Sequence, residues 1–99
     1  MGRAEGKVED YLRKRVKAEA GQARKLRWIG RRGAPDELVW FGAPLRQALF
    51  ECKSEDGELS KLQRREIDRM RDDGWLVFVV STHEEVDAAI RAVKEGLAI

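Results

Sequence analysis

Three polar residues stand near the ends of two short apolar segments in the middle of the chain. Asp36 precedes the apolar run Leu38–Phe41, and Glu51 and Lys53 close the second run after a turn that contains Gly and Pro. Both runs are rich in residues that favour strands, so this stretch is predicted to form a β-hairpin. Because strand side chains alternate between faces, Glu51 and Lys53 should point the same way and Cys52 the other.

Carboxylates on two neighbouring strands, with a lysine beside one of them, are the groups that a divalent-metal hydrolase requires. Mg²⁺ and Mn²⁺ prefer oxygen ligands, which Asp36 and Glu51 would supply. Such an ion polarises a phosphoryl group and lowers the pKa of bound water. Lys53 could orient that water or neutralise charge in the transition state. The pattern E-x-K is common in charged strands, so the surrounding elements must decide whether it marks a site.

A first helix is predicted over about residues 4 to 20, ending near Gly21. Its apolar residues at helical spacing are Val8, Leu12 and Val16. Glu5 falls close to the centre of that stripe and Glu9 on its flank. An unpaired buried carboxylate is costly, so Glu5 either lies in a frayed first turn or serves the metal site as a further ligand. Glu9, one turn on, is the alternate to Glu5.

A strand predicted over residues 23–29 leads into the basic loop Gly30-Arg31-Arg32-Gly33. Two glycines let the backbone approach a phosphate closely, and two arginines can clamp it. An ordinary turn is the alternative.

A second helix is predicted from about Lys61 to Asp73, and Gln63 in its first turn allows two interpretations. With Ser60 it fits a capping box, in which the glutamine reaches back to the cap residue. Gln63 also shares a helix face with Ile67 and could instead point toward the strands. The sequence leaves both roles open.

The rest of the chain completes one α/β domain over residues 1–99. Trp75–Val80 is predicted to be a buried strand, and Ser81 with Glu84 is predicted to cap a final helix. The expected order is α-β-β-β-α-β-α, with a mixed central sheet of about four strands flanked by helices.

Charge and composition favour a polyanionic partner in a reducing compartment. The net charge is only +2, from 20 Lys and Arg against 18 Asp and Glu, but the basic residues are clustered. No apolar run or signal peptide argues for a membrane or for export, and a single cysteine excludes an internal disulfide. A cytoplasmic location is therefore expected. The candidate DNA-binding residues are Arg31, Arg32, Lys61, Arg64 and Arg65.

Taken together, the motifs resemble those of the PD-(D/E)XK nuclease superfamily, and closely its VRR-NUC (virus-type replication-repair nuclease) family. They are a helix with Glu, G-A-P-D, E-C-K, a helix opening with L-S-K-L-Q and a closing strand. The resemblance runs to about Val93 and is closest to the stand-alone form found in phages and bacteria. It implies a restriction-endonuclease-like core.

The resemblance also implies roles for individual residues. Asp36 and Glu51 would be ligands of Mg²⁺ or Mn²⁺, Lys53 the catalytic lysine, and Gln63 the glutamine of the following helix. Glu5 is the preferred match for the acid of the first helix.

Similar stand-alone proteins resolve Holliday (four-way) junctions as homodimers, which implies branched double-stranded DNA as substrate and a role in DNA repair. The alternatives are a flap or branched-DNA nuclease, a nickase, or a non-catalytic DNA-binding module with the same fold. A dimer needs exposed apolar residues, and the candidates, although expected to be core, are Trp28, Trp40, Trp75 and Leu45.

Overall fold

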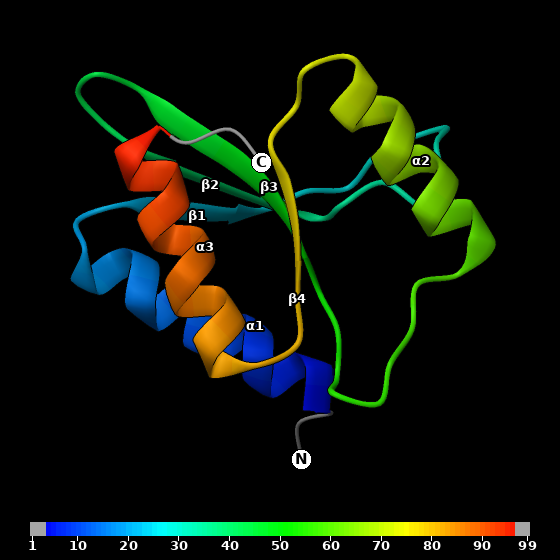
Figure 1. Cartoon of the computed structure of the whole chain (residues 1–99), viewed down its shortest axis with the longest axis horizontal. Helices are drawn as coiled ribbons and strands as arrows, with labels where there is room; N and C mark the ends of the chain where they lie inside the picture. The colour runs from blue at the N-terminus through cyan, green and yellow to red at the C-terminus, as the bar shows by residue number, and fades with distance from the viewer. Residues whose placement is uncertain (1–3, 97–99) are drawn as a thin grey trace.

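A four-stranded mixed sheet in the order β1-β2-β3-β4 organises the protein, as Figure 1 shows. The computed structural model describes the backbone of residues 4–96 and the side chains of residues 6–96. The elements are α1 (Ala4–Ala18), β1 (Gln22–Lys25), β2 (Glu37–Phe41), β3 (Arg46–Cys52), α2 (Lys61–Asp72), β4 (Val77–Val80) and α3 (His83–Glu95). The predicted fold class and element order are confirmed. No helix of the described chain is long and apolar enough to cross a bilayer.

The hairpin of β2 and β3 is the centre of the sheet. β2 pairs antiparallel with β1 and β3, whereas β3 and β4 are parallel. Glu37 is the register partner of Phe50. Because Asp36 precedes Glu37 and Glu51 follows Phe50, the antiparallel register brings the two predicted metal ligands to the same end of the hairpin.

The sheet is covered on both faces, as the apolar residues on both sides of β3 predicted. Helices α1 and α3 pack on one face and α2 on the other (Figure 1). Phe50 and Cys52 join the core beneath α1 and α3, while Leu49 packs with Ile67 of α2. The predicted α1 stripe is buried in the larger core. A central strand alternates in this way because its side-chain period is two.

The first helix ends two residues earlier than predicted. Ala20 has a positive φ of 63°, and a Cβ on Gly21 would lie 2.4 Å from the Phe41 ring. The left-handed residue at the helix end is therefore Ala20 and not Gly21, the predicted cap; Gly21 is needed instead for its close approach to Phe41.

Other predicted boundaries are also wrong. The first strand was predicted to reach residue 29 but ends at Lys25. The chain then leaves the sheet in a loop in which Trp28 Nε1 donates a hydrogen bond to the Pro35 carbonyl. The cap of α3 is Thr82 rather than Ser81: the Glu85 amide donates to Thr82 Oγ1 at 3.1 Å. The Glu85 carboxylate in turn accepts from the Ser81 amide at 2.7 Å, so the capping pair lies one residue later than predicted.

The expectation that the large apolar candidates are core is also wrong for three of them. Trp28, Trp75 and Leu45 are exposed, and the predicted strand at Trp75 begins only at Val77. Trp40 is half-buried, with the Arg24 guanidinium 5.0 Å from its ring centroid. The small core is filled instead by aliphatic residues and phenylalanines.

Candidate active site

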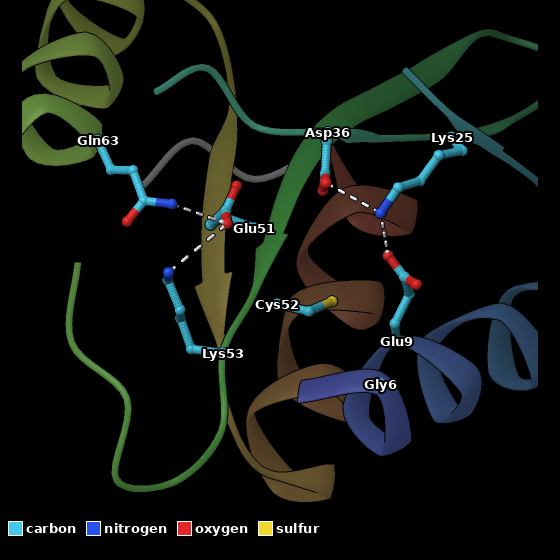
Figure 2. A pocket seen from close by; sticks show the side chains of 8 residues that line it. All are labelled: Gly6, Glu9, Lys25, Asp36, Glu51, Cys52, Lys53 and Gln63. Atoms are coloured by element: carbon cyan, nitrogen blue, oxygen red, sulfur yellow. Dashed lines mark hydrogen bonds and ion pairs between the residues drawn. The ribbon is translucent and has the colours of Figure 1, made fainter. Parts of the chain in front are cut away.

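A cavity of about 400 Å³ opens where β2 and β3 end beside α1 and α2. Figure 2 shows its lining side chains, which come from five different elements or their flanks. They are Gly6, Glu9, Lys25, Asp36, Glu51, Cys52, Lys53 and Gln63. The cavity thus brings together Asp36, Glu51, Lys53 and Gln63 of the sequence-predicted site residues.

Glu51 is held by side chains from β3's end and from α2. Gln63 Nε2 donates to Glu51 Oε2 at 3.2 Å, and Lys53 Nζ lies 4.0 Å from the same oxygen. Both Glu51 and Lys53 are largely shielded from solvent. A partner hydrogen bond and a nearby cation offset the cost of burying the carboxylate charge.

The two alternatives for Gln63 occur together. Its Oε1 accepts from the Ser60 amide at 2.9 Å, and its own amide donates to Ser60 Oγ at 3.1 Å, so the capping box is present. The amide nitrogen of the same side chain remains available to donate to Glu51. The cap therefore fixes the direction in which Gln63 presents its NH₂ group to the site.

Lys25, the last residue of β1, is a site residue that the sequence analysis missed. Its Nζ lies 2.7 Å from Glu9 Oε2 and 2.9 Å from Asp36 Oδ2, so one ammonium bridges two carboxylates (Figure 2). Burial is the largest single effect on its pKa and lowers it, but the hydrogen bonds to Glu9 and Asp36 together raise the pKa above that of an ordinary lysine. Only the register of β1, which pairs Lys25 with Glu37, places it here.

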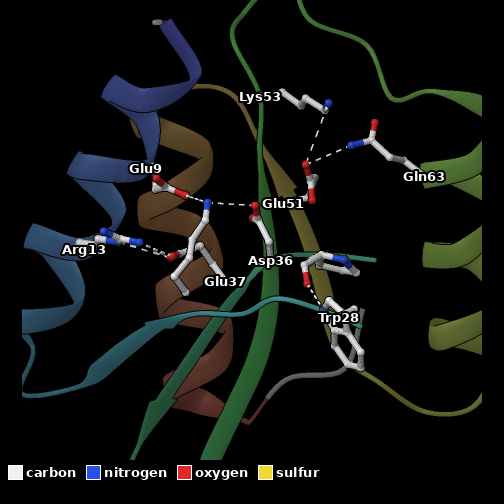
Figure 3. A network of polar contacts seen from close by, with 10 residues as sticks. Glu9, Arg13, Trp28, Asp36, Glu37, Glu51, Lys53 and Gln63 are labelled. Carbon is white, nitrogen blue, oxygen red and sulfur yellow. Dashed lines mark hydrogen bonds and ion pairs between the residues drawn. The ribbon is translucent and has the colours of Figure 1, made fainter. Parts of the chain in front are cut away.

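A second ion pair lies next to this bridge, one helical turn on from Glu9 and one residue on from Asp36. Arg13 of α1 forms a hydrogen bond of 2.6 Å from Nη2 to Glu37 Oε1, with Nε 3.4 Å from Oε2 (Figure 3). Glu37 is 0% exposed, and its hydrogen bond is the main reason that the pKa of Arg13 is raised. This pair ties α1 to the start of β2, beside Asp36.

The acid contributed by α1 is Glu9 among the described side chains. Glu5 lies in the first turn of α1, but its side chain is outside the described residues. Glu9 lines the cavity and contacts Lys25. The structure therefore places the alternate of the predicted pair at the site.

Cys52 has the character of a core residue, as predicted. It is buried in the larger core cluster while bordering the cavity. Burial first, and then the surrounding carboxylates, raises the pKa of its thiol to about 12. The sulfur is protonated at neutral pH and is a poor nucleophile.

The donor chemistry of the cavity fits a hard divalent cation. No three Asp, Glu, His or Cys side chains of the described chain gather closely enough to hold an ion by themselves. Mg²⁺ commonly binds through one or two carboxylates and completes its shell with water and phosphate oxygens. Asp36 and Glu51 could supply such a pair, with Glu9 beyond Lys25 as a third acid.

The predicted DNA-binding residues lie on α2 and on the loop between β1 and β2. Arg31, Arg32 and Arg65 line a second hollow, of about 310 Å³, between the loop after β1 and α2. Lys61 and Arg64 are exposed in the first turn of α2. The basic residues thus flank the helix that carries Gln63.

A P-D and E-x-K pair at one end of a hairpin, in a mixed sheet with helices on both faces, defines a domain of the PD-(D/E)XK nuclease superfamily. No family model matches the sequence, and no curated protein matches it. A solved structure described as a VRR_NUC domain is 37% identical, with a TM-score of 0.81 over 91% of this chain and 97% of that one. The chain belongs to the VRR_NUC family.

Proposed function

We propose that this protein is a metal-dependent, structure-selective endodeoxyribonuclease that resolves four-way DNA junctions as a homodimer. The observation that carries the proposal is the convergence of Asp36, Glu51, Lys53 and Gln63 on one cavity. Membership of the VRR_NUC family supports nuclease chemistry, and the arginines beside α2 support a polyanionic substrate.

The cavity residues divide the work of hydrolysing a phosphodiester. Asp36 and Glu51 would hold Mg²⁺ or Mn²⁺, which when bound polarises the phosphoryl group and acidifies water. Gln63 fixes the Glu51 carboxylate through the hydrogen bond to Oε2. Lys53, close to that carboxylate and largely shielded, can donate a hydrogen bond to a phosphate oxygen and offset the charge that develops there.

Hydrolysis requires one new phosphorus–oxygen bond, from water, and the loss of one ester bond to a sugar oxygen, which takes up a proton. The Cys52 thiol is unsuited to form a covalent intermediate, because it is buried and protonated, and the carboxylates of Asp36 and Glu51 are assigned to the metal. Direct attack by water therefore suits this set of side chains.

Dimerisation is supported by exposed apolar side chains remote from the cavity. Leu45 lies in the turn at the opposite end of the hairpin from Asp36 and is 59% exposed. Trp75, before β4, is also exposed. A two-fold dimer would match the near two-fold symmetry of a four-way junction, and light scattering of the purified protein tests it.

The function is tested with end-labelled four-way junction, flap and linear duplex of matched sequence, incubated with Mg²⁺, Mn²⁺ or EDTA. We expect paired, symmetric nicks on the junction that EDTA abolishes. Cutting of flaps alone would favour the branched-DNA alternative, and metal-independent binding without cleavage of any substrate would favour the non-catalytic module. Lys53→Met is the matched control for contaminating nucleases. Cuts made by this protein should disappear when Lys53 is replaced, whereas cuts made by a contaminant should remain.

Lys25 provides a test of metal binding that does not depend on cleavage. Lys25→Met is expected to tighten the binding of Mn²⁺ to the DNA-free protein by about tenfold, or ~1.4 kcal/mol. The ammonium carries a like charge and occupies oxygens of Glu9 and Asp36 that a cation would use. Calorimetric titration measures the change, with the exposed Lys17→Met as control. Weaker binding in Lys25→Met would show that Lys25 positions the ligands rather than competing for them.

A further inference from the structure

The loop between β1 and β2 combines several arginines with one exposed aliphatic side chain. We call residues 27–33 the arginine loop. Ile29 is 93% exposed, and the neighbouring Arg27, Arg31 and Arg32 are also exposed. A single exposed apolar residue is ordinary on a protein surface. Ile29 differs from such a residue because exposed arginines surround it and because its loop is attached to the residues that precede β2.

The base of the arginine loop closes on the candidate metal ligand Asp36. The Leu26 amide donates to the Asp36 carbonyl at 2.7 Å, and Trp28 Nε1 donates to the Pro35 carbonyl at 2.7 Å (Figure 3). These two bonds join the residues entering the loop to those leaving it. The base of the loop is therefore attached to the two residues that precede β2, of which Asp36 is one.

The far side of the loop is fastened to α2. Arg31 donates from Nη2 to Glu66 Oε1 at 2.7 Å and from Nε to Oε2 at 3.1 Å, a two-pronged contact. Gly33 has φ of 82°, and a Cβ there would lie 2.9 Å from the Leu62 carbonyl oxygen, so the backbones are in close contact. The loop that carries Ile29 is therefore attached at two places, to the residues that precede β2 and to α2.

The hollow between the arginine loop and α2 is strongly positive. Its lining residues are Gly30, Arg31, Arg32, Leu62, Arg65, Glu66 and Arg69. The acid in this set, Glu66, is paired with Arg31 and lies 3.6 Å from Arg69. The excess of cations favours a partner with a regular negative charge, which phosphates provide, over the face of another protein.

We propose that the arginine loop places Ile29 against an exposed base face at a DNA branch point while Arg32 and Arg65 hold the flanking phosphates. Aliphatic side chains inserted at a base step are a known means of prising stacked bases apart. That insertion is least costly where stacking is already interrupted, as at a branch. The loop would thereby select branched over continuous duplex and present it at Asp36; this role rests on the proposed nuclease function.

The test compares Ile29→Ser with Ile29→Leu, both made in the Lys53→Met background so that DNA is bound without being cut. A four-way junction carrying 2-aminopurine beside the branch reports unstacking by its fluorescence, and anisotropy gives affinities for the junction and for linear duplex. Ala88→Ser, at an exposed position of α3 on the other face of the sheet from α2, is the control for introducing a serine at an exposed site. Since Ile29 is almost fully exposed, none of its variants should lose stability.

We expect Ile29→Ser to lose the fluorescence rise and about tenfold of its preference for junction over duplex, while Ile29→Leu and Ala88→Ser keep both. An unchanged preference in Ile29→Ser would overturn the proposal. So would a change in oligomeric state by light scattering, which would assign Ile29 to an interface between copies. Failure of the nuclease function is seen separately, as absence of metal-dependent cleavage by the unsubstituted protein.

Discussion

Asp36→Asn is expected to lower the single-turnover cleavage rate by at least about 1,000-fold, or ~4 kcal/mol of transition-state stabilisation. Asparagine has nearly the same shape but lacks the negative charge that makes a carboxylate a strong ligand for a hard divalent cation. The substitution also weakens the ion pair with Lys25, which keeps its contact with Glu9. The fold should be retained, because Asp36 precedes β2 and is only half-buried.

Three measurements separate this effect from a general loss of function. Calorimetry should show weakened Mn²⁺ binding, and thermal melting should change little. Junction affinity in EDTA should stay the same or rise slightly, because a negative charge near the phosphates has been removed. Asp72→Asn, at the exposed end of α2, is the matched control. A rate within tenfold of the unsubstituted protein would remove Asp36 from the metal site.

The order of the elements and the faces of the hairpin could be predicted because they depend on local periodicity. A strand with a side-chain period of two must separate Glu51 from Cys52, and a helix with apolar residues every four positions must bury Leu12. The Ser60–Gln63 capping box is likewise a local feature. Each of these follows from residues that are close together in the sequence.

The contacts that complete the site could not be predicted, because they depend on how distant elements meet. Lys25 reaches Asp36 only through the pairing of β1 with β2. Glu9 of α1 likewise reaches the cavity only because α1 meets the end of the sheet there, while the side chain of Glu5 is outside the described residues. Glu37 stood next to the predicted ligand in sequence, but nothing local identified Arg13 as its partner.

Arg13→Met is expected to destabilise the protein by about 3 kcal/mol, because it leaves the charge of Glu37 buried without its cation. Glu37 is 0% exposed, whereas the Arg13 side chain is 43% exposed, so the loss should fall at the low end of the range for broken buried pairs. For a domain of this size, that corresponds to a fall in Tm of roughly 12–24 °C. Chemical denaturation at pH 7 measures the free energy of unfolding, and the exposed Lys14→Met should change it by less than about 0.5 kcal/mol.

A second substitution separates the effect of the unpaired charge from the effect of lost packing. Glu37→Gln in the Arg13→Met background removes the buried charge and should restore much of the stability, giving a large coupling energy in the double-mutant cycle. If Glu37→Gln does not recover stability, the aliphatic part of Arg13, and not its charge, joins α1 to the start of β2.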